Sequence, residues 1–146
     1  MGHRRQAREV ALQVLYQVDV SKIDPQEAIE LYCENFDIQD NVKEFSSELI
    51  LGTRQHIEEI DSFISNCSEH WTLDRMARVD KNILRMAVYE LLYCADIPPK
   101  ATLNEAIDIG KSYGTENSGS FINGILDALY VKLRKDDEDN TIFGTD

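Results

Sequence analysis

The sequence predicts an all-α protein of two docked three-helix bundles, and three observations support this fold class. Apolar residues recur at spacings of three and four along most of the 146 residues, as they do on the buried stripe of a helix. Residues that cap helices stand at the start of several of these periodic segments. No alternating apolar and polar run of useful length indicates a β-strand.

The first bundle is predicted over about residues 1–70. One apolar stripe over residues 7–20 predicts its first helix. Asp24, Pro25 and Glu27 then supply a capping side chain, a proline at the first helical position and a capping-box glutamate, which predict a second helix. The expected inner face of that helix consists of Ile29, Tyr32, Cys33 and Phe36.

A third and longer helix is predicted over residues 40–67. Asp40 is able to cap it, and the apolar period continues past Gly52. One unbroken helix of this length would span roughly 40 Å, at ~1.5 Å per residue. Trp71 follows in a short connection, where a brief capped turn is expected.

The second bundle is predicted over about residues 71–134. Its first helix, over residues 80–94, is apolar around more than half of its circumference, which places it at the centre of the fold. A pair of prolines then ends this helix, because proline lacks a backbone donor. A capping box from Thr102 to Glu105 predicts the next helix, which stops at Gly114.

The C-terminal part of the chain divides into a helix and a tail. Asn117 or Ser118 caps the last helix, whose apolar face completes a single domain over residues 1–134. Residues 135–146 are acidic and are expected to form a disordered tail.

The charge distribution restricts where a nucleic acid could bind. The formal net charge is −12, which argues against indiscriminate binding to polyanionic phosphate backbones. Removing residues 136–146 leaves −7, while the first nine side chains together carry +2. Any nucleic-acid site is therefore expected to be local and to involve the amino-terminal arginines.

The cysteines and the amino terminus indicate the cytoplasm. Cys33, Cys67 and Cys94 are odd in number, lie far apart and include no Cys-x-x-Cys pair, which suits a reducing compartment. The first residues lead into an amphipathic segment and not into the apolar run of a signal peptide. No segment has the length and hydropathy of a membrane span, so no membrane partner is expected.

The sequence predicts no catalytic centre, cofactor or metal. Gly110-Lys111-Ser112 matches the end of a phosphate-binding loop, but the motif's earlier glycine is missing because Glu105 stands there. Cys67 and His70 have the spacing of two zinc ligands, but a closed site needs four. We therefore expect a binding protein and not an enzyme.

The amino-terminal arginines are the strongest candidates for a functional site. Arg4 and Arg8 share one helical face with Arg5 beside them, at the helix end where the macrodipole disfavours cations. Folding alone does not require them there, whereas guanidinium groups suit RNA phosphates. Tyr16 lies two turns further along and offers a ring for base stacking. The alternative is a frayed, solubilising terminus.

Four segments together resemble the NusB family of bacterial transcription antitermination factors. They are residues 7–16, residues 79–92, Ile97-Pro98 with residues 104–107, and Ser118 with residues 121–127. The resemblance covers nearly all of residues 4–134 with family-like spacing. It implies an all-helical protein of two small bundles that binds boxA RNA together with NusE, a ribosomal small-subunit protein. It also implies that this assembly joins an elongating RNA polymerase complex, without catalysis or cofactor.

The resemblance also assigns candidate residues by position. The RNA surface it implies consists of Arg4, Arg5, Arg8, Tyr16, Arg85, Asn117 and Phe121. The protein-partner surface would involve the start of the central helix, with Asp80 and Leu84 as candidates. Ser120 departs from the family pattern, because relatives often carry a basic residue there.

Two other functions stay open. A protein–protein adaptor or homodimer could hide the arginine surface and bind no RNA. An enzyme fragment is the second alternative, since NusB-like domains also precede the catalytic domain of ribosomal RNA cytosine methyltransferases. The chain shows no βαβ unit and no glycine-rich cofactor loop, which disfavours this second alternative.

Overall fold

The computed structural model describes the backbone of residues 2–68 and 71–144 and the side chains of residues 2–68 and 71–134. Over these residues it contains helices and a short 3₁₀ turn but no strand, which confirms the all-α class. The elements are α1 (His3–Ser21), α2 (Pro25–Asn35), α3 (Asp40–Gln55), α4 (Ile57–Cys67), η1 (Leu73–Arg75), α5 (Arg78–Tyr93), α6 (Pro99–Tyr113) and α7 (Ser118–Gly144).

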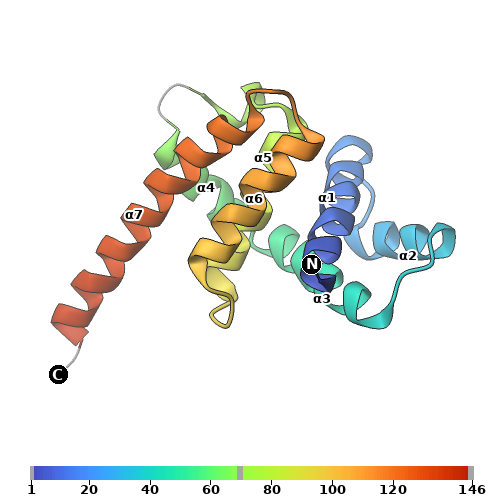
Figure 1. Cartoon of the computed structure of the whole chain (residues 1–146), viewed down its shortest axis with the longest axis horizontal. Helices are drawn as coiled ribbons and strands as arrows, with labels where there is room; N and C mark the ends of the chain where they lie inside the picture. Colours follow the sequence, from blue (N-terminus) through green and yellow to red (C-terminus); the bar gives the residue numbers. More distant parts are fainter. Residues whose placement is uncertain (1, 69–70, 145–146) are drawn as a thin grey trace.

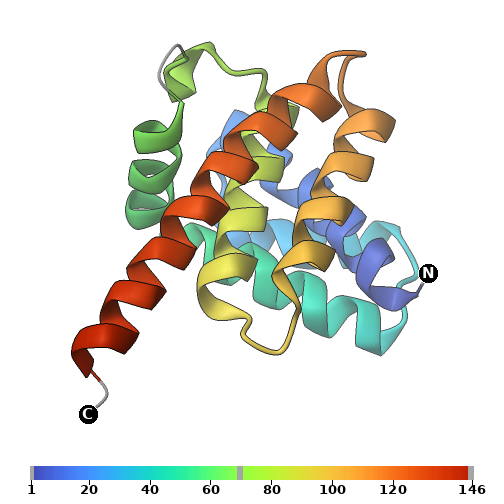
Figure 2. The same ribbon diagram turned by 60° about the vertical axis from the view of Figure 1, so that its left-hand side comes forward.

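Helix α5 forms the centre of the molecule, as its apolar circumference predicts. It packs against α1, α3, α4, α6 and α7, and every residue from Asn82 to Glu90 is buried. Figures 1 and 2 show α5 near the middle, with α1 to α3 on one side of it and α7 crossing on the other. Every element that carries a candidate site residue is therefore positioned, directly or through a neighbour, by α5.

The expected long third helix is wrong, because it breaks at His56 into α3 and α4. His56 has φ −108° and ψ 26°, outside the helical region. The break allows α4 to turn back onto α5 and α7, where Ile60 and Ile64 become fully buried. Burial of such side chains stabilises the fold by roughly 1.5–3 kcal/mol each, and this favours the break over a straight helix.

Two finer expectations also differ from the structure. Helix α6 begins at Pro99, three residues before the predicted capping box, because proline is well tolerated at the first helical position. Thr102 and Glu105 consequently lie within the helix, and their side chains bond to other helices. Phe36 does not belong to the inner face of α2, since it follows the helix and is 55% exposed.

The acidic C-terminal segment continues helix α7 as far as Gly144, where a disordered tail was expected. The buried first half of α7 supplies the costly nucleus, and each further residue adds one backbone hydrogen bond. Residues 125–143 contain neither glycine nor proline, which would interrupt this propagation. Figure 1 shows the end of α7 projecting beyond the other helices. Residues 145 and 146 lie outside the described part of the chain.

Candidate nucleic-acid interface

The arginine cluster, defined as Arg4, Arg5 and Arg8, lies on the first two turns of α1 and faces α5 and α6. Arg8 is buried, and its Nε and Nη2 donate to the two carboxylate oxygens of Glu90 at 2.8 and 2.7 Å. The Thr102 hydroxyl donates to the same carboxylate at 2.9 Å. Arg8 therefore joins α1, α5 and α6, and its guanidinium is not presented to solvent.

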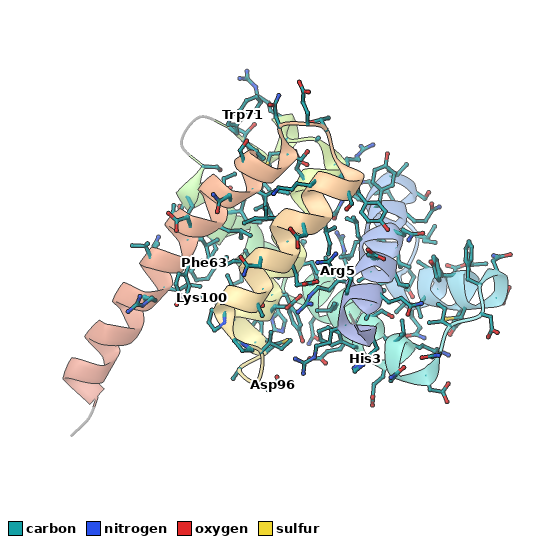
Figure 3. The ribbon with its side chains drawn as sticks, in the orientation of Figure 1. His3, Arg5, Phe63, Trp71, Asp96 and Lys100 are labelled. Carbon is teal, nitrogen blue, oxygen red and sulfur yellow. The ribbon has the colours of Figure 1, made fainter. Side chains whose placement is uncertain are left out.

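Arg5 is half-buried and bonded to two carboxylates of α6. Its Nε and Nη2 both donate to Glu105, the second at 3.0 Å, and Nη2 also donates to Asp108 at 3.1 Å. The hydrogen bonds from Arg5 hold the pKa of Glu105 below its usual value, although partial burial opposes this. The pKa of Arg5 is raised, chiefly by the bond to Glu105. Figure 3 shows Arg5 between α1 and α6.

Arg4 is the most exposed member of the cluster. Its Nη2 donates to Asp96, in the turn between α5 and α6, at 3.2 Å. Its guanidinium carbon also lies 5.8 Å from the centre of the Phe45 ring, within the range of a cation–π contact. The three arginines thus run from a solvent-accessible position at Arg4 to a buried one at Arg8.

A second candidate region, the aromatic pocket, lies where η1, α5 and α7 begin. It measures about 320 Å³ and is lined by Trp71, Arg75, Met76, Ala77, Asp80, Thr115, Asn117 and Phe121. The rings of Trp71 and Phe121 meet edge to face, with centres 5.9 Å apart. Trp71 is 49% exposed, so its ring is able to stack on an unpaired base. The pocket therefore combines aromatic surface with polar groups able to read a base edge.

Asp80 stands out within the aromatic pocket because its carboxylate is incompletely bonded. The side chain is buried, and within the described residues its Oδ1 has no hydrogen-bond partner. An unsatisfied buried carboxylate oxygen is costly in the free protein. Because this oxygen is itself buried, a donor on a binding partner would reach it only if the side chains around it move.

The remaining predicted residues lie in different environments. Tyr16 is 41% exposed on α1 and is available for stacking. Arg85 is buried and bonds to Asp61 through two donors at 2.8 Å. Leu84 is completely buried and presents no surface to a partner. The structure therefore brings Asn117, Phe121 and Asp80 together and joins Arg4, Arg5 and Arg8 at another place. Of the nine candidates, four are buried: Arg8, Asp80, Leu84 and Arg85.

Sequence reasoning missed Trp71 and the carboxylates that face the arginine cluster. Trp71 is the one tryptophan of the chain and stands in a connection between helices, a signal that could have marked it. Figure 3 places it at the opposite end of the molecule from Asp96. The partners of the arginines lie 82 to 103 residues away in sequence, and no local pattern indicates them.

The structure also bears on metals and membranes. Among the described residues no three His, Cys, Asp or Glu side chains are grouped so that they could hold a metal ion. Cys67 and His70 have the spacing of two zinc ligands, but His70 lies outside the described residues. His56 stacks on Tyr93, with ring centres 4.3 Å apart.

In the described part of the chain no helix has the length and apolar character needed to cross a bilayer.

Comparison with known proteins identifies the family. The NusB family model matches residues 5–131. A transcription antitermination protein NusB of Syntrophus aciditrophicus is 56% identical over 142 residues, covering 97% of this chain and 88% of the relative. The corresponding protein of Desulfatibacillum aliphaticivorans is 47% identical over 138 residues, covering 94% of this chain and 96% of the relative.

Solved structures agree with this assignment. NusB from T. maritima has 39% sequence identity and a TM-score of 0.80, over 88% of this chain and 90% of that one. A NusB chain in a structure of the antitermination factors NusB and NusE with dsRNA has 34% identity and a TM-score of 0.82, over 90% of this chain and 98% of that one. On the match to residues 5–131 and on these identities, the chain belongs to the NusB family.

Proposed function

We propose that this protein is an RNA-binding transcription antitermination factor that binds boxA-type RNA together with NusE. In this proposal the complex joins the RNA polymerase elongation complex during ribosomal RNA transcription, in the cytoplasm. The observation that carries the proposal is family membership over residues 5–131, together with a related structure in which NusB and NusE are bound to dsRNA. The role is one of binding and assembly, and no bond-making step is assigned to the chain.

The RNA surface that we propose uses the accessible candidates. Arg4 and Arg5 would contact phosphates at the start of α1, while Asn117 and Phe121, together with Trp71, would hold bases in the aromatic pocket. Tyr16 would add a stacking surface on α1.

Two further arginines of the proposed surface would act through other residues. The guanidinium of Arg8 is held by Glu90, and that of Arg85 is held by Asp61. Both are positioning residues in this proposal, because they fix α1 and α5 relative to α6 and α4. Their replacement would weaken RNA binding through loss of shape and not through loss of a phosphate contact.

NusE is proposed to approach near the start of α5. Asp80 lines the aromatic pocket, and its buried Oδ1 has no hydrogen-bond partner among the described residues; a basic side chain of NusE would satisfy it if the pocket rearranges on binding. Leu84 contributes to this surface only as core support, since it is completely buried. An Asp80→Asn variant should weaken NusE binding, and because Asp80 also lines the aromatic pocket, its effect on the binding of RNA alone is measured separately.

The experiment that tests the proposed function is a titration of boxA-like RNA with and without NusE at several salt concentrations. It compares the natural chain with Arg4→Ala/Arg5→Ala and with Phe121→Ala. Lys132→Ala removes one exposed positive charge from α7 and serves as the control, with which the arginine variant is compared per removed charge. We expect NusE to strengthen binding, and the arginine variant to reduce the salt slope by ~0.7 per lost phosphate contact on single-stranded RNA. Absence of binding with NusE present would contradict the proposal.

A protein-only adaptor is the second candidate, because the arginine cluster is paired with carboxylates of the same chain. Such an adaptor would bind NusE without RNA, or would form a homodimer. Binding of NusE that is unchanged by RNA, combined with identical behaviour of the arginine and control variants, would favour this candidate.

A further inference from the structure

Folding surrounds the arginine cluster with negative charge. The first nine side chains carry +2 in the sequence, but their three arginines meet four carboxylates of distant segments: Asp96, Glu105, Asp108 and Glu90. Glu44 and Glu48 line the same hollow as Arg4. The cluster is therefore not a free basic patch in the isolated protein.

These four carboxylates differ in how deeply they lie. Glu90 is buried, and Glu105 has two bonds from Arg5 and a further contact with Arg8, so both belong to the packing between helices. The side chains of Asp96 and Asp108 are 75% and 53% exposed, and each makes one contact with an arginine. Exposed pairs of this kind contribute little to stability. Folding therefore does not account for the placement of Asp96 and Asp108.

We propose that Asp96 and Asp108 compete with RNA phosphates for Arg4 and Arg5 and thereby lower the affinity of the protein for RNA in general; this inference rests on the proposed function. A carboxylate oxygen and a phosphate oxygen accept from the same guanidinium donors. A phosphate that reaches Arg4 or Arg5 either displaces the aspartate or shares the guanidinium with it. In both cases a negative charge stays beside the RNA backbone.

The competition acts on every RNA equally, because phosphates carry no sequence information. The aromatic pocket, which would hold bases in the proposed complex, is not lined by Asp96 or Asp108. A penalty that is equal for all RNAs leaves the ratio of their affinities unchanged and lowers every affinity. Asp96 and Asp108 therefore set how weakly the protein binds an RNA that makes phosphate contacts alone, without base contacts or NusE.

The test uses the full chain and two RNA probes. One probe is a single-stranded oligouridylate that measures sequence-independent affinity, and the other is boxA-like RNA with NusE. Asp96→Asn/Asp108→Asn removes both competing charges. Asp127→Asn/Glu58→Gln removes two exposed charges from α7 and α4 and is the matched control. Thermal melting verifies that all variants are folded.

We expect the Asp96→Asn/Asp108→Asn variant to bind oligouridylate about fivefold more tightly per removed charge at low salt. Its salt slope should steepen by up to ~0.7 for each arginine released. The control should change much less. Adding Arg4→Ala/Arg5→Ala to the double aspartate variant should abolish the gain in affinity, because the RNA phosphates bind to these two arginines.

Two results would overturn the inference: an affinity gain equal to that of the control, or a gain that survives removal of Arg4 and Arg5. The boxA probe with NusE separates this failure from failure of the proposed function. If the natural chain binds that probe but the aspartate variants show no gain on oligouridylate, the inference alone fails. If the natural chain does not bind it while an arginine-dependent gain on oligouridylate appears, the proposed function fails and the competition stands. Absence of binding to either probe by every variant contradicts both.

Discussion

Arg8 and Glu90 form a two-donor ion pair in the interior of the protein, although 82 residues separate them in the sequence. Both side chains are almost inaccessible to solvent, and Thr102 satisfies a further acceptor site on Glu90. A buried pair of this kind is retained only when its geometry and hydrogen bonding are good, since both charges have lost their water. Together with Thr102, this pair connects α1 with α5 and α6.

Replacing Arg8 by alanine should destabilise the protein by about 3–5 kcal/mol, because Glu90 would stay buried without its counter-charge. Urea denaturation at neutral pH measures this change in the free energy of unfolding. Arg4→Ala is the matched control and should cost less than about 1 kcal/mol, since its pair with Asp96 is exposed. Equal effects of the two substitutions would show that the Arg8–Glu90 pair is not a buried, stabilising contact.

Gly52→Ala and Gly124→Ala should change stability in opposite directions. A Cβ on Gly52 would overlap the ring of Tyr89, which is itself buried and stacked on Tyr93. The overlap should outweigh the better helix propensity of alanine and destabilise the protein by about 1–2 kcal/mol. A Cβ on Gly124 meets nothing within 4 Å, so that alanine should stabilise α7 by about 0.5–1 kcal/mol. Thermal unfolding of the two variants is the measurement, and a neutral Gly52→Ala would contradict the close packing of α3 on Tyr89.

The ion pair between Arg5 and Glu105 should make stability fall in acid. The hydrogen bonds from Arg5 lower the pKa of Glu105 below its ordinary 4.5, so the folded state favours the charged carboxylate. The stabilisation is therefore complete above that pH and is lost as the pH falls further, through the lowered pKa of the folded state. Denaturation between pH 3 and 7 measures the free energy of unfolding of the natural chain and of Glu105→Gln. The natural chain should be the more stable near neutral pH, and this difference should shrink as the pH falls below 4.5. A difference that is constant over the whole range would exclude this linkage.

Cys94 should be the least reactive of the three thiols. Burial, and then the neighbouring carboxylate of Glu48, raises the pKa of Cys94 from 9.0 to about 12. The reactive thiolate is therefore about a thousandfold scarcer at neutral pH than in an unperturbed cysteine. Alkylation followed by mass spectrometry should label partly exposed Cys33 well before Cys94, and denaturation should remove the difference. Equal rates in the folded protein would mean that the region around Glu48 opens readily.

Much of the helical structure could be predicted from the sequence, because its determinants are local. The Asp24 side chain accepts a hydrogen bond from the backbone N–H of Glu27, as the spacing of these residues predicts. The apolar circumference of residues 80–94 likewise predicted that α5 is central. Both inferences depend on residues of one continuous segment, so the sequence of that segment is enough to make them.

Other features depended on how the helices dock, and the sequence could not determine them. The break at His56 depends on the packing of α4 against the apolar surfaces of α5 and α7. The apolar period of residues 40–67 continues through His56 and therefore does not indicate the break. The aromatic pocket exists because Trp71 and Phe121 meet across a separation of fifty residues. The docking of the helices also determines which side chains are exposed: Leu84 lies in the core, whereas Tyr16 lies on the surface.

The arginine cluster shows this division most clearly. Its sequence alone determined that positive charges gather at the start of the first helix, because neighbouring residues share that turn. Only the tertiary structure decided that Glu90, Glu105, Asp108 and Asp96 meet them. The physical reason is that a helix period specifies which face of a segment is apolar, whereas the partner of a charged side chain is set by the packing of whole helices.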